Sequence, residues 1–219
     1  MSIGTILAST IITEVARRLN DTNNTNKRWD GTDILTSLNS GQKMIAEVRP
    51  AASVKAVSVL MVAGFEQILP TADGKEFLAL SYNSGTAGTT KGKAIVQMQE
   101  SLLDAINSEW RSITGTEEIE YFAPNPDFPG QYLVYPPNDG TGYAHLRYNS
   151  IPIDVAATTD PINIGDEYRE PLILATVWFA LADATENPQL MALRQDILSQ
   201  FQATMGIKVT ADAPVDRNR

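Results

Sequence analysis

The spacing of apolar residues changes twice along this 219-residue chain, and that change constrains the fold more than any other feature. Residues 1–50 and 166–206 carry apolar side chains three and four positions apart, as amphipathic helices do. Residues 51–165 instead hold short β-branched and alternating runs bounded by glycine and proline, the pattern of strands and turns. This order predicts an α+β protein in which the N- and C-terminal helices form one bundle and a small β-rich domain is inserted between them. Residues 207–219 show no such spacing, so we expect an extended C-terminal arm.

Local signals predict where the helices begin and end. Asp30 is a suitable N-cap, and Asp33 stands three residues later, in the position of a capping box. Pro50 is expected to stop that helix, because the residue before a proline is biased away from helical geometry. In the C-terminal part, Asp166 is the expected N-cap of the first helix, and Gly206 is expected to follow the last one.

The middle of the chain is predicted to alternate between strands and turns, with one short helix over residues 101–107. A loop rich in glycine and threonine is expected over residues 84–92, where nothing in the sequence indicates a regular element. Prolines 124, 126, 129, 136 and 137 are expected in the turns. The expected strands cover residues 54–62, 67–70, 77–80, 94–98, 118–122, 131–135 and 143–148.

Composition and charge exclude several classes of function. The chain has no cysteine, so it can form neither disulfides nor a thiolate metal site. Its net charge of −9 is unevenly spread, since residues 100–206 hold four basic and sixteen acidic side chains. Such a surface repels phosphate and argues against nucleic-acid binding as the main task, although it could also serve only solubility. The longest apolar stretch, residues 172–182, falls short of the ~20 residues that cross a bilayer, so we expect no membrane partner.

The residues capable of catalysis form no recognisable constellation. His145, the one histidine, falls in an alternating strand pattern, where a histidine is usually structural. Glu117, Glu118 and Glu120 could bind a cation, with Glu118 and Glu120 on one face of a strand, but acidic strand edges also protect against aggregation. Motifs for nucleotides, phosphate, a nucleophile elbow or a zinc protease are absent. We therefore expect no enzyme activity, no cofactor and no bound metal.

The aromatic residues favour packing over ligand binding. Trp29 precedes a predicted helix and is expected to close the pair of N-terminal helices, while Trp178 and Phe179 are expected in the core. Trp110 has no clear assignment. Tyrosines cluster in the predicted sheet, where they could stack on sugars or bases, or pack across strands. These tyrosines are residues 121, 132, 135, 143 and 148.

Short sequences along nearly the whole chain carry a resemblance to a known family. The structural motif of that family corresponds to Trp29, Asp33, Asn39, Gln42 and Arg49. The further matching sequences are Arg28-Trp29, Leu38–Gln42, Arg49-Pro50, Ala63-Gly64, Gln67–Pro70, Trp110, Thr114–Thr116, Tyr121–Pro126, Tyr132–Pro137, Glu170–Ala184 and Met205-Gly206. In their order and spacing they resemble the head-to-tail adaptor (connector) proteins of tailed bacteriophages, and podovirus-like portal adaptors in particular. Pro171 departs from the pattern, because a helix-favouring residue is expected there.

The resemblance implies a structural role in the neck of the virion, for a protein made in the host cytoplasm. Family members form a ring, expected to be a dodecamer, that docks on the portal protein by an arm and continues the DNA channel. A tail nozzle or tail-tube protein would attach on the other side, and a tail fibre is a further candidate partner. DNA would pass without specific binding, along an acidic channel or surface for which Glu117, Glu118 and Glu120 are candidates. The arm is expected to comprise Ile207, Lys208, Val209, Arg217 and Arg219.

Two other functions remain open at the level of sequence. A virion receptor-binding or fibre-attachment module would use the tyrosine-rich sheet as its recognition face. A hydrolase would need paired carboxylates, such as Glu118 and Glu120, and would lose activity when either is changed. The full-length resemblance and the helical ends favour the adaptor.

Overall fold

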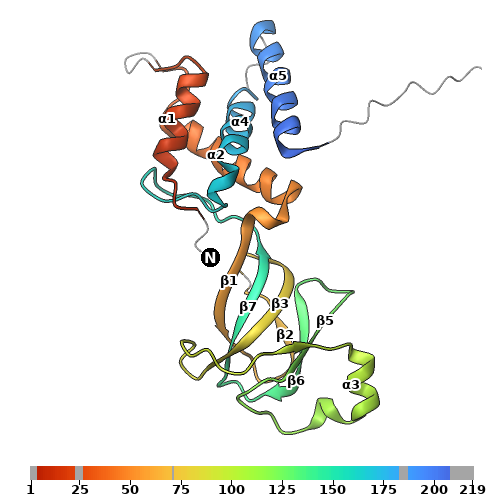
Figure 1. Cartoon of the computed structure of the whole chain (residues 1–219). Helices are drawn as coiled ribbons and strands as arrows, with labels where there is room; N and C mark the ends of the chain where they lie inside the picture. Colours follow the sequence, from red (N-terminus) through yellow and green to blue (C-terminus); the bar gives the residue numbers. More distant parts are fainter. Residues whose placement is uncertain (1–3, 23–26, 71, 183–186, 208–219) are drawn as a thin grey trace, which may run out of the picture. The chain divides into compact units, whose positions relative to one another are not determined.

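Figure 1 shows the computed structural model, which describes residues 4–22, 27–70, 72–182 and 187–207. The chain is α+β, as predicted, and divides into two compact units. One, here called the β unit, comprises residues 50–153. The other, the helical unit, combines residues 4–49 with the chain from residue 154 onward. The helical unit therefore depends on contacts between segments that lie more than a hundred residues apart in sequence.

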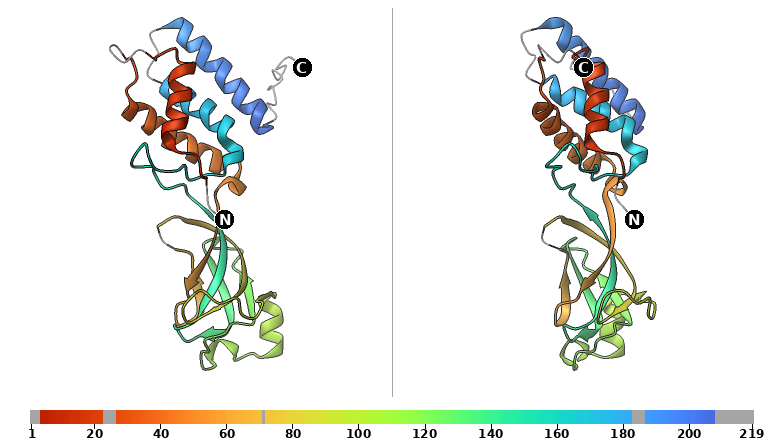
Figure 2. Two further views of the ribbon diagram at one scale, coloured as in Figure 1. Left: turned by 60° about the vertical axis from the view of Figure 1, so that its left-hand side comes forward. Right: turned by 90° about the vertical axis from the view of Figure 1, so that its left-hand side faces the viewer.

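Helix α4 lies at the centre of the helical unit, where it contacts the three other long helices (Figure 2). Residues 171–177 of α4 are all buried, because this helix is apolar on every side and can be covered all round. Gly41 of α2 permits the closest approach, since a Cβ there would lie 3.3 Å from side-chain atoms of Leu172 and Ala175. The long helices described in this unit are α1 (Ala8–Arg18), α2 (Gly31–Val48), α4 (Arg169–Ala180) and α5 (Pro188–Met205).

Most helix ends follow the local signals in the sequence. The capping box of Asp30 and Asp33 is confirmed at the start of α2, and Gly206 ends α5 in the left-handed conformation with φ 66°. The prediction that Asp166 caps the next helix is wrong. Residues 166–168 form a short 3₁₀ turn (η3) before α4, and the Asp166 carboxylate accepts hydrogen bonds from the backbone N–H of Thr5 at 2.7 Å and of Ile6 at 3.2 Å. The carboxylate oxygens that would cap the helix therefore bind the N-terminal segment at Thr5 and Ile6 instead.

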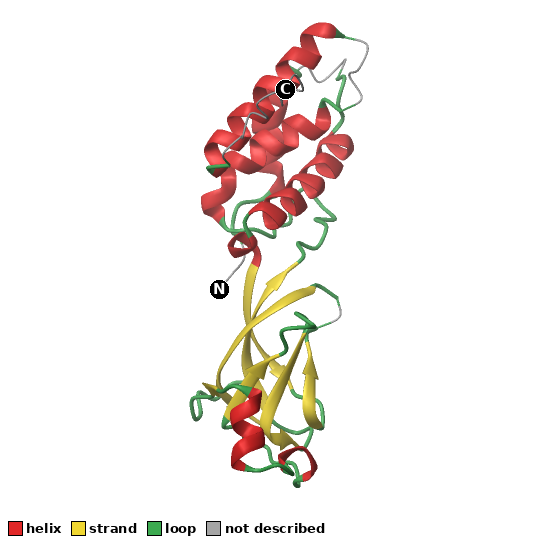
Figure 3. Cartoon of the chain, turned by 90° about the vertical axis from the view of Figure 1, so that its right-hand side faces the viewer, coloured by secondary structure: helices red, strands yellow, loops and turns green. Residues whose placement is uncertain are grey.

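The described part of the β unit contains two sheets and one short helix, α3 (Glu100–Ile106) (Figure 3). The strands described are β1 (Val54–Leu60), β2 (Gly64–Ile68), β3 (Gly74–Gly85), β4 (Val96–Gln97), β5 (Tyr121–Pro124), β6 (Gln131–Asn138) and β7 (Tyr143–Ser150). One sheet has the order β1–β7–β3 and the other β2–β6–β5–β4. Only the β4–β5 pair runs parallel among these strands. Short 3₁₀ turns, η1 (Pro50–Ser53) and η2 (Trp110–Ser112), complete the unit.

Two clusters of buried apolar residues form the core of the β unit. The larger joins the two sheets, where Phe77 of β3 stacks on Tyr132 of β6 with ring centroids 4.2 Å apart. The smaller surrounds Trp110, which is completely buried and meets Phe65 edge-on at 5.4 Å. Trp110, whose position the sequence left open, is therefore a core residue that holds α3 against the second sheet through Leu103.

Several expected boundaries in the β unit are wrong for identifiable reasons. Pro136 and Pro137 lie inside β6 and not in a turn, opposite an irregularity in the pairing of β2 and just beyond the last residue paired with β5. A strand tolerates proline at positions where neither adjacent strand would accept a hydrogen bond from a backbone N–H. The strand expected over 94–98 shortens to Val96–Gln97. The loop expected over 84–92 begins within β3 and folds back on it, with the Thr90 N–H donating to the Ser84 carbonyl at 3.2 Å.

Candidate functional site

Two amide side chains of α2 fasten this helix to the C-terminal part of the chain. Asn39 donates from Nδ2 to the Val155 carbonyl at 3.1 Å, and its Oδ1 accepts the Val155 N–H at 2.8 Å. Gln42, which is completely buried, donates to Asn39 Oδ1 at 3.2 Å and accepts the Asn163 N–H at 2.5 Å. Because a buried amide is tolerated only when its polar atoms are paired, these residues fix the segment from 155 to 163 against α2.

Trp29 and Arg49, one on either side of α2, hold the carbonyl ends of two other helices. The Trp29 indole N–H donates to the carbonyl of Ala180, the last residue of α4, at 2.8 Å. The Arg49 guanidinium donates to the carbonyl of Met205, the last residue of α5, at 2.7 Å. The last carbonyls of a helix have no partner inside it, so these donors satisfy groups that would otherwise need water. The sequence indicated Trp29 as a packing residue of the N-terminal helices and did not reveal its bond to α4.

All five residues of the proposed family motif therefore serve the internal structure of the helical unit. Asp33 completes the capping box at the start of α2, while the other four bind backbone atoms or each other. Their partners lie up to 156 residues away, at positions that spacing within α2 cannot indicate. The sequence offered one signal for this role: two amide side chains within the predicted helix and a side-chain donor at each of its ends, all able to bind backbone atoms.

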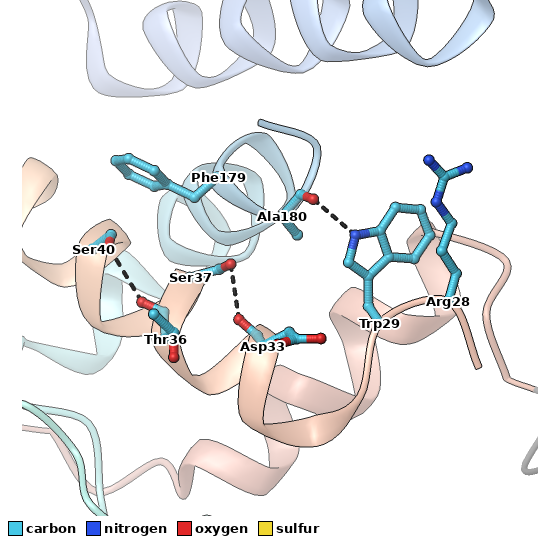
Figure 4. Close-up of a pocket in the computed structure, with 8 residues that line it drawn as sticks. All are labelled: Arg28, Trp29, Asp33, Thr36, Ser37, Ser40, Phe179 and Ala180. Carbon is cyan, nitrogen blue, oxygen red and sulfur yellow. Dashed lines mark hydrogen bonds between the residues drawn. The ribbon is translucent and has the colours of Figure 1, made fainter. Parts of the chain in front are cut away.

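A pocket of about 450 Å³ opens beside Trp29 in the helical unit (Figure 4). Its floor is one face of α2, on which the hydroxyls of Thr36, Ser37 and Ser40 each donate to the carbonyl four residues earlier. These hydroxyls are satisfied within the helix and keep lone pairs that can accept hydrogen bonds from a bound molecule. The residues that line the pocket are Arg28, Trp29, Asp33, Thr36, Ser37, Ser40, Phe179 and Ala180.

The pocket carries an arginine without an acidic partner. The Arg28 guanidinium lies over the Trp29 ring, 4.9 Å from its centroid, and no carboxylate in the described part of the chain forms an ion pair with it. Figure 4 shows Trp29 and Phe179 on opposite sides of the pocket. Both rings are half-buried. The prediction that Phe179 and its neighbour Trp178 lie in the core is therefore wrong, because Trp178 is half-buried as well. The pocket therefore combines two aromatic rings, three hydroxyl side chains and two opposite charges, those of Arg28 and Asp33.

The three candidate channel carboxylates, Glu117, Glu118 and Glu120, are exposed, and one of them is paired. Glu118 accepts a hydrogen bond from the Lys93 ammonium at 2.6 Å, and this bond raises the pKa of Lys93 above its ordinary value. Glu117, Glu118 and Glu120 all precede β5, so the prediction of a strand from residue 118 is wrong. The reason is that the Asn83 side chain forms hydrogen bonds with both the N–H and the carbonyl of Ile119, so these groups do not pair with a strand. Within the described ranges, no group of three acidic or histidine side chains could hold a metal ion.

His145 has the surroundings of a structural residue. Its ring stacks on Tyr82 with centroids 4.7 Å apart, and burial lowers its pKa below the ordinary value. Its Nδ1 is buried without a hydrogen-bond partner among the described atoms. The described surroundings of Nδ1 therefore offer no group that would orient or activate this ring as a general base.

Packing accounts for the most buried of the sheet tyrosines. Tyr132 is stacked on Phe77, and Tyr148 donates to Asp73 at 3.1 Å. Burial, with the negative charge of Asp73 as a second cause, raises the pKa of Tyr148 to about 12. Tyrosines 121, 135 and 143 are half-buried. The five residues therefore do not form one exposed stacking platform.

The predicted arm falls almost wholly outside the described residues. Ile207 is half-buried, and its N–H donates to the Gln202 carbonyl at 2.9 Å just after the end of α5. Lys208, Val209, Arg217 and Arg219 lie outside the described part of the chain. No helix within the described ranges is long and apolar enough to cross a membrane.

Comparison with known proteins places the chain in a family. The model of the SU10 adaptor protein family matches residues 6–218, which include both units and all five motif residues. No curated protein matches the chain. The match confirms the resemblance to phage adaptors, while the narrower likeness to podovirus-like portal adaptors stays a prediction. The chain belongs to the SU10 adaptor protein family, a family of structural adaptors of phages.

Proposed function

We propose that this adaptor forms a ring between the portal and the tail of a tailed phage and continues the DNA channel from one to the other. The observation that carries the proposal is the family match over residues 6–218, because it includes both the helical unit and the β unit. The hydrogen bonds within the helical unit support a structural role, since the motif residues bind backbone carbonyls and N–H groups of the same unit. Function is thus assigned to assembly and not to chemistry.

The ring is proposed to be a dodecamer that assembles on the portal from chains that are mainly monomeric alone. A tail nozzle or tail-tube protein would bind the opposite side, with a tail fibre as a further candidate. In sedimentation of the isolated chain at micromolar concentration, we expect the mass of a monomer. A stable dodecamer in that experiment would contradict assembly by templating on the portal.

The channel is proposed to let DNA slide without holding it. Residues 100–206 carry four basic and sixteen acidic side chains, an excess of −12, and Glu117, Glu118 and Glu120 are exposed. Like charge repels the phosphate backbone, so we expect no appreciable binding of duplex DNA at physiological salt. Salt-sensitive micromolar binding in a gel-shift assay would contradict a repulsive channel.

The C-terminal arm is proposed to dock on the portal through Ile207, Lys208, Val209, Arg217 and Arg219. Burying two branched apolar side chains on a partner would stabilise the complex by about 1.5–3 kcal/mol each before the entropy of ordering is subtracted. The test is deletion of residues 207–219 followed by measurement of melting and of association with the portal protein of the same phage. Unchanged melting with lost association supports the arm, and undiminished association rejects it.

A further inference from the structure

Strand β1 has an open edge over most of its length. It pairs with β7 in a regular antiparallel register on one side, and no strand among the described residues pairs with it on the other (Figure 1). The Met61 N–H donates to the Gly142 carbonyl at 3.0 Å, and hydrogen-bonded pairs alternate along an antiparallel ladder. The backbone groups of Ala56, Ser58 and Leu60 therefore point away from β7, and they form no hydrogen bond within the described part of the chain.

Other edges of the β unit are protected against pairing in ways that folded proteins commonly use. The edge of β3 is covered by a later segment, where the Asn83 N–H donates to the Lys93 carbonyl at 2.9 Å. Just beyond the end of β1, the Gln67 amide binds both the N–H and the carbonyl of Val62. Strand β2 is shorter than β1, and its register with β6 is irregular. Residues 56–60 of β1 have no charged side chain, no proline and no break in register, so this edge is suited to pairing with another strand.

The core of the β unit is also incomplete beside this edge. Val57 lies directly opposite Leu146 of β7, so the two side chains share the face of the sheet that forms the larger core cluster. Leu146 is completely buried, whereas Val57 is 39% exposed. Val59, the next β1 residue on that face, is only partly buried. Apolar side chains from one further strand would cover this part of the core.

The opposite face of the same strand pair carries a cation without a partner. Arg147 of β7 is exposed, and no carboxylate in the described part of the chain forms an ion pair with it. Ala56 of β1 lies directly opposite Arg147, and its small side chain leaves room for the guanidinium to extend toward a strand beyond β1. Burial is the first cause that lowers the pKa of His145 on this face, and the positive charges of Lys91 and Arg147 contribute. This face is therefore complementary to acidic side chains.

We propose that a strand of the tail nozzle or tail-tube protein pairs with the open edge of β1 and alternates apolar side chains over Val57 with acidic side chains beside Arg147. This inference rests on the proposed function, which assigns the C-terminal arm to the portal and leaves the tail protein without a binding site on this chain. Strand addition obtains affinity from main-chain hydrogen bonds and specificity from alternate side chains. The apolar residues of the added strand complete the core at Val57, and a carboxylate opposite Ala56 pairs with the Arg147 guanidinium.

Hydrogen exchange at single residues tests the pairing. The full-length chain is assembled on the portal protein of the same phage, the tail protein is added, and exchange is read by mass spectrometry with residue resolution. The N–H groups of Ala56, Ser58 and Leu60 should exchange about tenfold more slowly once the tail protein is bound. Those of Val57 and Val59 face β7 and should change little. Uniform slowing over all five residues would indicate a covered surface without strand pairing and would overturn the inference.

The outcomes separate this inference from the proposed function. Failure of the chain to form a ring on the portal, or of the tail protein to bind that ring, contradicts the proposed function and the inference with it. A ring that binds the tail protein without the alternating protection overturns the inference alone. Alternating protection that is present before the tail protein is added assigns the edge to a neighbouring copy and overturns the tail protein as its occupant.

Proline substitution tests the edge itself. Ala56→Pro removes an N–H that points away from β7, so the ring should still form on the portal while binding of the tail protein weakens about tenfold. Ile68→Pro is the matched control on β2, where the Leu69 N–H donates to the Gly130 carbonyl and the Ile68 N–H points away from β6. Binding of the tail protein should be unchanged in this control. Equal binding by the two variants would overturn the assignment to the edge of β1.

Reversal of charge tests the acidic character of the added strand. Arg147→Glu should weaken binding of the tail protein about tenfold, because like charges then face each other. Lys75→Glu is the matched control, since Lys75 is also an exposed cation of the β unit without an ion pair among the described residues. This control should weaken binding less than about twofold, because exposed charges farther from the contact are screened by salt. Equal losses in the two variants would assign the effect to net charge and overturn the role of Arg147.

Discussion

The helical unit and the β unit use amide side chains for different purposes. In the helical unit, Asn39 and Gln42 bind backbone 116 and 121 residues away, so they join the two ends of a chain that the β unit interrupts. In the β unit, Asn83 donates to the Ile119 carbonyl at 2.7 Å and accepts the Ile119 N–H at 2.8 Å. There the amide replaces strand pairing just before β5 begins. The comparison shows that an amide side chain can either join segments that are distant in sequence or replace backbone hydrogen bonds where a sheet lacks a neighbouring strand.

The two units also differ in the apolar surface that they expose. Among the described residues, all but three of the large exposed hydrophobic side chains belong to the β unit. The exceptions are Leu7, Val48 and Met191. A contiguous exposed apolar surface can mark where a partner binds, and the described residues of the β unit offer more exposed apolar side chains than those of the helical unit.

The largest effect is expected at Gln42. Gln42→Ala removes the acceptor of the Asn163 N–H and leaves a cavity at a completely buried position, which should lower the free energy of unfolding by about 3 kcal/mol. Chemical denaturation measures this. Lys43→Ala is the neighbouring control, because the Lys43–Asp154 pair is exposed and should contribute less than about 1 kcal/mol. Equal effects of the two substitutions would show that Gln42 does not fasten the unit.

A smaller effect is expected at Asn83. Asn83→Ala removes the hydrogen-bond partner of the N–H and of the carbonyl of the buried Ile119, which should lower the free energy of unfolding by about 2 kcal/mol. Hydrogen exchange should show the loss of protection at Ile119, while the N–H of Val155 in the helical unit keeps its protection. Asn83→Asp sharpens the test, since it can still accept from the Ile119 N–H but can no longer donate. Protection of Ile119 unchanged in Asn83→Ala would mean that the amide is not a substitute for strand pairing.

Trp29→Phe should lower the free energy of unfolding by about 1 kcal/mol, because it removes the indole donor to the Ala180 carbonyl and keeps an aromatic ring in place. The matched control is Trp178→Phe, since the Trp178 indole N–H makes no hydrogen bond within the described part of the chain. Thermal unfolding of the two variants measures the difference. A Trp178 variant as destabilised as the Trp29 variant would assign the effect to ring volume and not to the bond with α4.

The smallest effect is expected from acid at Asp166. Hydrogen bonds from the Thr5 hydroxyl and N–H hold the pKa of Asp166 below its ordinary value. A carboxylate whose pKa falls on folding stabilises the fold above its unfolded pKa, and this contribution is lost as the pH falls through the lower, folded pKa. Exchange protection of the Thr5 and Ile6 N–H groups should therefore decrease below about pH 4. In Asp166→Asn it should be low at every pH, and a wild-type profile in that variant would contradict the role of the charge.

What the sequence could predict depends on how far apart the interacting groups lie. The capping box of Asp30 and Asp33 and the helix end at Gly206 were predictable, because each involves groups within a few residues. Asp166 has the same local signal as a cap, yet its oxygens bind Thr5, 161 residues away, which no spacing indicates.

The same limit applies to the candidate site. Trp29, Asn39, Gln42 and Arg49 were identified by resemblance, but their partners become visible only in the folded chain. The pocket beside Trp29 depends on Phe179, which the local pattern assigned to the core. Local signals predicted the start of α2 and the end of α5, whereas contacts distant in sequence decide what the polar side chains bind and where α4 begins.

Electron microscopy of the full-length chain mixed with the portal protein of the same phage tests the central claim most directly. The proposed function predicts a closed ring of chains seated at one end of the portal, with a central channel continuous with that of the portal. Portal particles without added density, or single chains bound at separate sites on their outer surface, would contradict it.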